Sequence, residues 1–168
     1  MPETQDAAAE LVALCIRKSL TVATAESCTG GLVAAAITDI AGSSAVLDRG
    51  FVTYSNEAKQ QMLGVPASVI EAHGAVSRAC AEAMASGALR HAPVSLAVAI
   101  TGIAGPGGDS AEKPVGLVHF AAAARDGPLI HRVCTFGDVG RDKVRRASVL
   151  EALSMLMQLA EAGLDQRP

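Results

Sequence analysis

Residues 20–37 read LTVATAESCTGGLVAAAI, and this stretch decides the fold. Residues 20–25 form a short apolar run with several β-branched side chains, which predicts a buried strand. Two glycines at 30–31 break the run, and the small apolar residues that follow favour a helix. The polar triplet Ser-Cys-Thr at 27–29 is therefore expected on the turn between a strand and a helix.

The same alternation of strand and helix patterns continues along the chain. A continuous apolar run predicts a strand at 94–100, a further strand is predicted at 47–54, and residues 115–124 and 129–136 are predicted to form a hairpin. Periodic apolar positions predict helices at 6–18, 55–63, 77–91 and about 140–162, with a short helix after Pro66. We therefore expect one α/β domain over residues 1–168. Its architecture should be a three-layer α/β/α sandwich around a mixed, mostly parallel sheet of about five or six strands.

The composition argues against several classes of protein. Half of the residues are apolar, but three Phe, one Tyr and no Trp are too few for a platform that stacks nucleic-acid bases. The formal net charge of −3 offers no broad attraction to nucleic acid or to an anionic membrane. The N-terminus lacks the pattern of a signal peptide, and no apolar run reaches the roughly 20 residues of a membrane helix. We expect a cytoplasmic protein with no nucleic-acid and no membrane partner.

The cysteines do not form a recognisable framework. They are scattered singly, without a CxxC pair, at Cys15, Cys28, Cys80 and Cys134. This spacing suggests neither a metal cage nor a set of disulfides. We expect no metal ion and no other cofactor, and we expect three of the cysteines to be small core residues, with Cys28 on the first turn.

Three loops follow predicted strands and are the candidates for a site, because open α/β sheets bind ligands at the carboxyl ends of their strands. One carries Ser27, the second follows Tyr54, and the third is the glycine-rich segment 101–114. A serine hydroxyl becomes a good nucleophile when a base takes its proton, and backbone N–H groups on such a turn can hold an oxyanion. The alternative is that Ser27 or Thr29 only caps the following helix.

Lysine is favoured over histidine as the base for Ser27. The histidines fit no Ser-His-Asp pattern, and the turn lacks the G-x-S-x-G form, so all four are expected to be structural: His73, His91, His119 and His131. A lysine with a lowered pKa can deprotonate a serine, and Lys59 follows the single tyrosine, Tyr54, at the same predicted edge. Tyr54 could relay a proton or orient the serine. The alternative is a packed tyrosine and a solvated lysine.

Two further segments could bind an anion. The loop TGIAGPGG (101–108) has little side-chain bulk, so its N–H groups could approach a phosphate or a carbonyl oxygen. It matches neither the P-loop nor the dinucleotide fingerprint. The last helix begins with a basic cluster at 141–146, which either binds an anion or is solvated.

Several long motifs, in order, resemble one known family. The segments AESCTGG, ITDIAGSSAVLDRGFVTYSNEAKQQMLGV, HGAVS, TGIAGPGG and EKPVGLVHFA are similar to the CinA C-terminal domain family, in particular to its stand-alone members, the PncC-type nicotinamide-nucleotide amidases. The resemblance runs from about residue 21 to residue 146. Longer members of the family carry an additional N-terminal domain.

The resemblance implies a reaction and a set of residues. The reaction is hydrolysis of the carboxamide of nicotinamide mononucleotide to nicotinic acid mononucleotide and ammonia, in pyridine-nucleotide salvage, by a homodimer. The implied catalytic set falls on Ser27, Tyr54 and Lys59. For the oxyanion and the substrate's phosphate we expect backbone and side-chain groups of Cys28, Thr29, Gly30, Gly42, Ser43, Ser44, Thr101, Gly102, Gly105 and Arg145.

Three other interpretations of these residues are possible. Cys28 could replace Ser27 as the nucleophile, since a helix start lowers the pKa of a thiol. A short-chain dehydrogenase is discarded, because its Tyr-x3-Lys pair follows the glycine loop, whereas here the spacing is Tyr-x4-Lys and the glycine loop comes later. A non-catalytic nucleotide-binding protein, or an accessory protein associated with competence and DNA damage, remains the alternative function.

Overall fold

A mixed sheet forms the centre of the molecule. The computed structural model describes residues 2–162. Within them the sheet has five strands in the order β2-β1-β3-β4-β5. Their bounds are β1 Val22–Glu26, β2 Leu47–Val52, β3 Leu96–Gly102, β4 Leu117–Ala124 and β5 Leu129–Thr135. β1 is parallel to β2 and to β3, whereas β4 is antiparallel to both of its neighbours, β3 and β5. Four strands thus run one way, which confirms the expected mixed, mostly parallel sheet.

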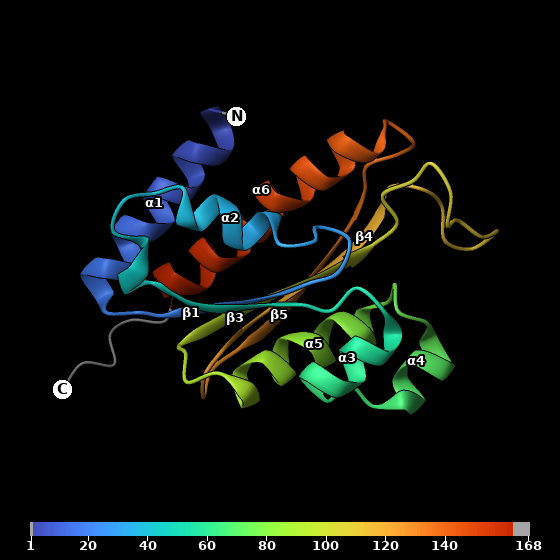
Figure 1. Ribbon diagram of the computed structural model, residues 1–168, viewed down its shortest axis with the longest axis horizontal. Helices are drawn as coiled ribbons and strands as arrows, with labels where there is room; N and C mark the ends of the chain where they lie inside the picture. Colours follow the sequence, from blue (N-terminus) through green and yellow to red (C-terminus); the bar gives the residue numbers. More distant parts are fainter. Residues whose placement is uncertain (1, 163–168) are drawn as a thin grey trace.

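Helices cover both faces of this sheet (Figure 1). One face carries α1 Pro2–Lys18, α2 Leu32–Thr38 and α6 Arg141–Ala162. The other carries α3 Asn56–Leu63, α4 Ala67–His73 and α5 Arg78–His91. A short 3₁₀ helix, Ser43–Ala45, precedes β2. The three layers confirm the expected α/β/α architecture.

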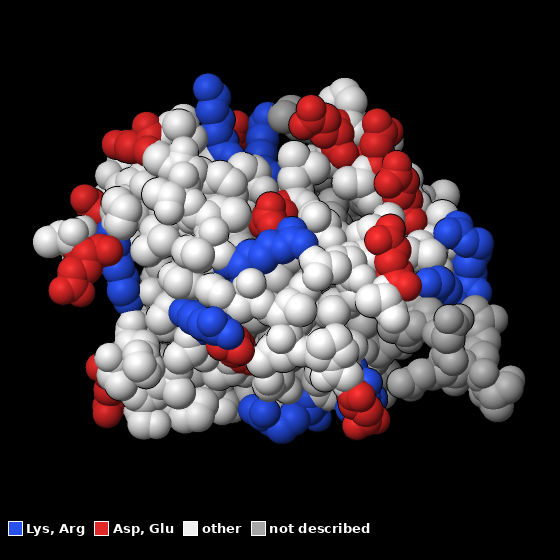
Figure 2. Space-filling model, turned by 180° about the vertical axis from the view of Figure 1, so that it is seen from behind, with Lys and Arg blue, Asp and Glu red and all other residues white. Residues whose placement is uncertain are grey.

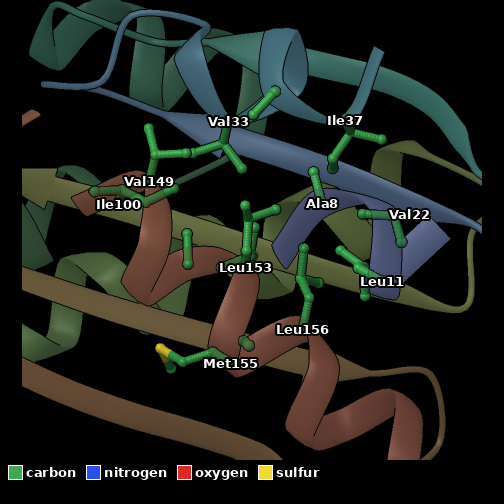
Figure 3. Close-up of a cluster of buried hydrophobic side chains, with 14 of the residues drawn as sticks. Ala8, Leu11, Val22, Val33, Ile37, Ile100, Val149, Leu153, Met155 and Leu156 are labelled. Carbon is green, nitrogen blue, oxygen red and sulfur yellow. The ribbon is translucent and has the colours of Figure 1, made fainter. Parts of the chain in front are cut away.

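The two faces of the sheet are packed with side chains of different size. On the face of α1, α2 and α6, branched and aromatic residues such as Val22, Ile100 and Phe120 join helix residues in the larger core (Figure 3). On the face of α5, the buried strand residues are alanines: Ala23, Ala25, Ala97, Ala99, Ala121 and Ala123. Because successive strand residues point to opposite faces, this alternation builds a thick core on one side and a thin one on the other. Alanine thus fills the second core in place of aromatic residues.

The close packing of α5 also positions α3, the helix that carries Lys59. A Cβ added at Gly87 would lie 2.0 Å from the carbonyl oxygen of Leu63, the last residue of α3. We expect Gly87→Ala to lower the free energy of unfolding by about 1–3 kcal/mol, because overpacking outweighs the better helix propensity of alanine. Urea denaturation measures this, with Ser86→Ala on the same helix as the control. A Gly87→Ala variant as stable as the control would contradict the close approach.

On the face seen in Figure 2, acidic side chains gather toward the upper right, and elsewhere acidic and basic side chains are interspersed. Among the helices of the described residues, none is long and apolar enough to cross a membrane.

Candidate active site

The loops expected to form a site meet in one pocket of about 330 Å³ at the carboxyl ends of β1 and β3. Its lining includes residues from all three predicted loops and one from the start of α6: Ser27, Tyr54, Lys59, Thr101, Gly105 and Arg141. The parallel register of β1 with both neighbours brings these loops together, since it aligns the strand ends. The topology therefore produces the site that the strand-end rule predicts.

Ser27 and Lys59 are in direct contact. The Nζ of Lys59 lies 3.0 Å from the Oγ of Ser27, 2.9 Å from the carbonyl oxygen of Thr53 and 3.1 Å from that of Tyr54. The lysine is 1% exposed and the serine 8% exposed. Ser55 accepts a hydrogen bond from the N–H of Ala58 and so caps α3 as predicted, which directs the first turn of this helix toward the end of β1.

The surroundings of Lys59 favour its neutral form. Burial lowers the pKa of the amine from its ordinary value of 10.5, because the charged form loses its hydration. No carboxylate is hydrogen-bonded to the amine within residues 2–162. A neutral amine has two N–H groups and one lone pair, and these match two carbonyl oxygens and one hydroxyl. The lone pair then faces the proton of Ser27, which is the arrangement a general base requires.

Tyr54 takes part in the site differently from the prediction. β2 ends at Val52, two residues earlier than expected, and the chain turns so that the Tyr54 carbonyl accepts from Lys59. The hydroxyl accepts a 3.0 Å hydrogen bond from Nη2 of Arg141, and the residue is 62% exposed. In the described part of the chain, no hydrogen bond joins this hydroxyl to Ser27 or Lys59, so in this arrangement it relays no proton between them.

Arg141 joins two of the loops and is a pocket residue that the sequence did not single out. Its Nη1 donates a 2.8 Å hydrogen bond to the carbonyl of Gly105, while its Nη2 holds Tyr54. The basic cluster at 141–146 was the available signal, but a cluster of charges does not reveal which member faces the pocket.

The turn after β1 leaves two backbone donors near the serine. The N–H of Ser27 donates to Ile100 at 2.9 Å, and the N–H of Gly30 donates to the Ser27 carbonyl at 3.0 Å. Gly30 is thus committed to the turn and is not a free oxyanion donor. Within residues 2–162 the N–H groups of Cys28 and Thr29 donate to no backbone carbonyl, and the Cys28 N–H interacts with its own thiol. These two are the remaining candidates for the oxyanion on this turn.

The helix-cap interpretation of Ser27 and Thr29 is wrong. α2 begins at Leu32, its N-cap is Gly31 with a φ of 106°, and no side chain of the N-cap residue binds the helix. The Thr29 hydroxyl is buried without a hydrogen-bond partner in the described structure. The first-turn N–H groups are held instead by a carboxylate, that of Glu26.

Cys28 does not fit the alternative in which its thiol replaces Ser27 as the nucleophile. Burial raises the pKa of this thiol to about 11, because desolvation outweighs the nearby positive charge of Arg145. At neutral pH the thiol is therefore protonated, and a protonated thiol is a poor nucleophile.

Some expected binding residues lie elsewhere. The turn formed by Gly42, Ser43 and Ser44 precedes β2 and lies beside the beginning of β1, where the N–H of Val22 donates to the carbonyl of Val46. These residues are therefore at the opposite end of the strands from the pocket. A Cβ added at Gly42 would lie 3.6 Å from Cδ1 of Ile16 in α1. The strand register that fixes this position cannot be read from the sequence. For that reason the serine-containing turn was predicted to bind phosphate.

Other expected residues are in or near the pocket with specific partners. Thr101 lines it and donates to the carbonyl of Ala75 at 2.9 Å, and Gly102 lines it beside Gly105. Arg145 points instead at the Ser27 turn, where it donates to the carbonyls of Cys28 at 3.1 Å and Thr29 at 3.3 Å.

The histidines do not enter the pocket. Nδ1 of His119 in β4 lies 3.0 Å from Nε2 of His131 in β5. Burial lowers the pKa of both imidazoles. None of the four lines the pocket, so none supplies its base.

Comparison with known proteins gives a consistent result. Residues 4–160 match the family model described as the CinA C-terminal domain. The chain is 57% identical over 142 residues to the nicotinamide-nucleotide amidohydrolase PncC of Escherichia coli K12, which covers 84% of this chain and 85% of that protein. It is 54% identical over 135 residues to a CinA-like protein of Anaeromyxobacter dehalogenans, covering 80% of this chain and 33% of that longer protein. The crystal structure of the competence/damage inducible protein CihA from Agrobacterium tumefaciens superposes with a TM-score of 0.92 at 54% identity, covering 94% of this chain and 95% of that one.

Proposed function

This chain belongs to the CinA C-terminal domain family, and we propose that it hydrolyses the carboxamide of nicotinamide mononucleotide to nicotinic acid mononucleotide and ammonia. The observation that carries the proposal is the buried contact between Lys59 Nζ and Ser27 Oγ at 3.0 Å, which pairs a nucleophile with a base. The name of the E. coli relative supports the choice of a nicotinamide nucleotide as substrate.

In the first half of the reaction, Ser27 forms an ester with the substrate. Its oxygen attacks the carboxamide carbon while its proton passes to Lys59, and the C=O electron pair moves onto oxygen. We assign that oxyanion to the N–H groups of Cys28 and Thr29 on the turn. Lys59 returns the proton to the amide nitrogen, the C–N bond breaks, and ammonia leaves.

In the second half, water releases the acid. Water attacks the ester carbon and gives its proton to Lys59, the bond to Ser27 breaks, and the serine oxygen regains the proton. The product carboxylate replaces the carboxamide. Both halves use the same base, so each depends on Lys59 being neutral at the start.

The remaining pocket groups suit a nucleotide. Arg141 contributes a positive charge to the pocket lining, beside a glycine-rich wall that includes Gly105, Gly107 and Gly108. Guanidinium and backbone N–H groups bind phosphate well. We infer that the 5′-phosphate binds to Arg141 and this wall, and not to Gly42, Ser43 and Ser44, which lie at the other end of the strands.

The test is ammonia release from nicotinamide mononucleotide by the purified chain with EDTA present. We expect equal amounts of ammonia and nicotinic acid mononucleotide, separated by chromatography, with no added metal. Tight binding of the nucleotide without ammonia release would favour the alternative, a nucleotide-binding protein without turnover.

The Tyr54 hydroxyl should matter less than the other two residues. We expect Tyr54→Phe to lower kcat/KM by about 10-fold or less, mainly through KM, because the lost hydrogen bond holds Arg141 and the backbone carbonyl that binds Lys59 is retained. Steady-state kinetics measure this. A loss as large as that of Ser27→Ala would mean that the hydroxyl takes part in proton transfer after all.

The homodimer implied by the family resemblance and the cytoplasmic location expected from the sequence stay predictions. Light scattering at the concentration of the activity assay tests the first, and cell fractionation tests the second.

A further inference from the structure

We propose that Glu26 is a positioning residue, whose carboxylate fixes the turn that carries Ser27 in its reactive geometry. The inference rests on the proposed function. Glu26 directly precedes the serine at the end of β1 and is 0% exposed. A carboxylate that is fully buried beside a catalytic group needs compensating donors, because removing its hydration is costly.

The compensation is complete and comes largely from the start of α2. Oε1 accepts from the N–H groups of Gly31 at 3.2 Å and Val33 at 2.9 Å. Oε2 accepts from the N–H of Ala34 at 3.1 Å and from the hydroxyl of Thr24 at 3.2 Å. The N-cap residue of α2 contributes no side-chain bond, so this carboxylate holds the beginning of the helix in place of an ordinary cap.

Glu26 does not act as a charge partner of the base. Adjacent strand residues point to opposite faces of a sheet, and Glu26 binds α2 on one face while Ser27 contacts α3 on the other. The hydrogen-bonding contacts of Lys59 Nζ are those with Ser27, Thr53 and Tyr54. The carboxylate therefore acts through the backbone of the turn.

The turn is also held by Arg145 of α6, whose guanidinium binds the carbonyls of Cys28 and Thr29. In a planar trans peptide the N–H points opposite to the C=O. The Thr29 N–H, which shares a peptide plane with the Cys28 carbonyl, therefore points away from Arg145. Glu26 and Arg145 together fix the direction of an oxyanion donor as well as the place of Ser27.

Kinetics of Glu26→Gln test the inference. We expect kcat to fall about 10- to 100-fold, because a displacement of about 1 Å at a reacting group has effects of that size, with KM within about threefold. The pH at which kcat/KM is half-maximal should stay that of wild type, since the lysine is untouched. Thr24→Val, which removes one side-chain donor and leaves the three backbone bonds, is the matched control and should stay within about threefold of wild type. A folded Glu26→Gln variant with kcat within threefold of wild type, or with a displaced pH midpoint, would overturn the positioning role.

Two further measurements keep the test decisive. Glu26→Asp keeps the charge and withdraws both oxygens by one methylene group, so it takes the place of Glu26→Gln if the latter does not fold, with the same expected loss in kcat. Hydrogen–deuterium exchange should be faster at residues 31–34 in the Glu26 variant than in wild type. If wild type releases no ammonia, the proposed function fails, but hydrogen–deuterium exchange still tests the role of Glu26. Exchange at residues 31–34 that is the same in the Glu26 variant and in wild type would overturn the inference.

Discussion

Ser27→Ala is expected to lower kcat for ammonia release by about 10⁴-fold or more, because the variant has no nucleophile to form the ester. The fold should be kept, since among residues 2–162 the serine hydroxyl is hydrogen-bonded to Lys59 alone and the turn is held by backbone bonds. The measurement is single-turnover ammonia release at saturating nicotinamide mononucleotide. Binding of the nucleotide should persist in this variant.

The matched control is Cys28→Ala at the neighbouring position. This thiol has a pKa raised to about 11 by burial, so it contributes little thiolate at neutral pH. We expect kcat within about threefold of wild type. Loss of activity in Cys28→Ala together with retention in Ser27→Ala would reverse the assignment of the nucleophile.

Lys59→Met should lower kcat/KM by about 10³-fold or more, because methionine fills the space of the lysine stem but cannot take a proton. The double variant with Ser27→Ala should be no slower than Ser27→Ala alone, since the two residues act in one step. If the double variant were slower than wild type by the product of the two single-variant losses, Ser27 and Lys59 would act independently.

The same lysine should be costly for stability. Its pKa is lower in the folded chain than in the unfolded one, so the unfolded state binds more protons between the lowered value and 10.5, and stability rises with pH across that window. Below the lowered pKa the burial of the charged amine opposes folding. Lys59→Met removes this cost but also two hydrogen bonds to carbonyls, so we expect a net change of about 1 kcal/mol or less at pH 7, measured by urea denaturation.

The sequence allowed the layers and the strand-to-helix order to be predicted, because apolar periodicity reports directly on burial. Ser27 and Lys59 followed from the same reasoning, since both lie at ends of elements that a parallel sheet brings together. The prediction failed where the position of a residue depends on the register of the strands or on the orientation of a side chain. Gly42 and its neighbours precede a strand rather than follow one, and only the pairing of Val22 with Leu47 places them at the far end of the strands.

Buried electrostatics were the other source of error. The alternative of Cys28 as the nucleophile assumed that a helix start lowers the pKa of its thiol, but burial dominates there and raises it. Glu26 was overlooked because a carboxylate at the end of an apolar run looks like the exposed end of a strand. The signal was present in the glycines at 30–31, which leave the next helix without a side-chain cap and its N–H groups open to a nearby acid.

The protonation of Lys59 tests the central claim most directly. The chain contains four lysines, so ¹³C labelling at Cε gives four NMR signals, and Lys59→Met identifies the one required. We expect this signal to titrate well below 10.5 and at the same pH at which kcat/KM for nicotinamide mononucleotide rises to its plateau, since the neutral amine is the active form. A Lys59 signal that stays that of an ammonium throughout the pH range of full activity would contradict the account, because Ser27 would then have no base beside it.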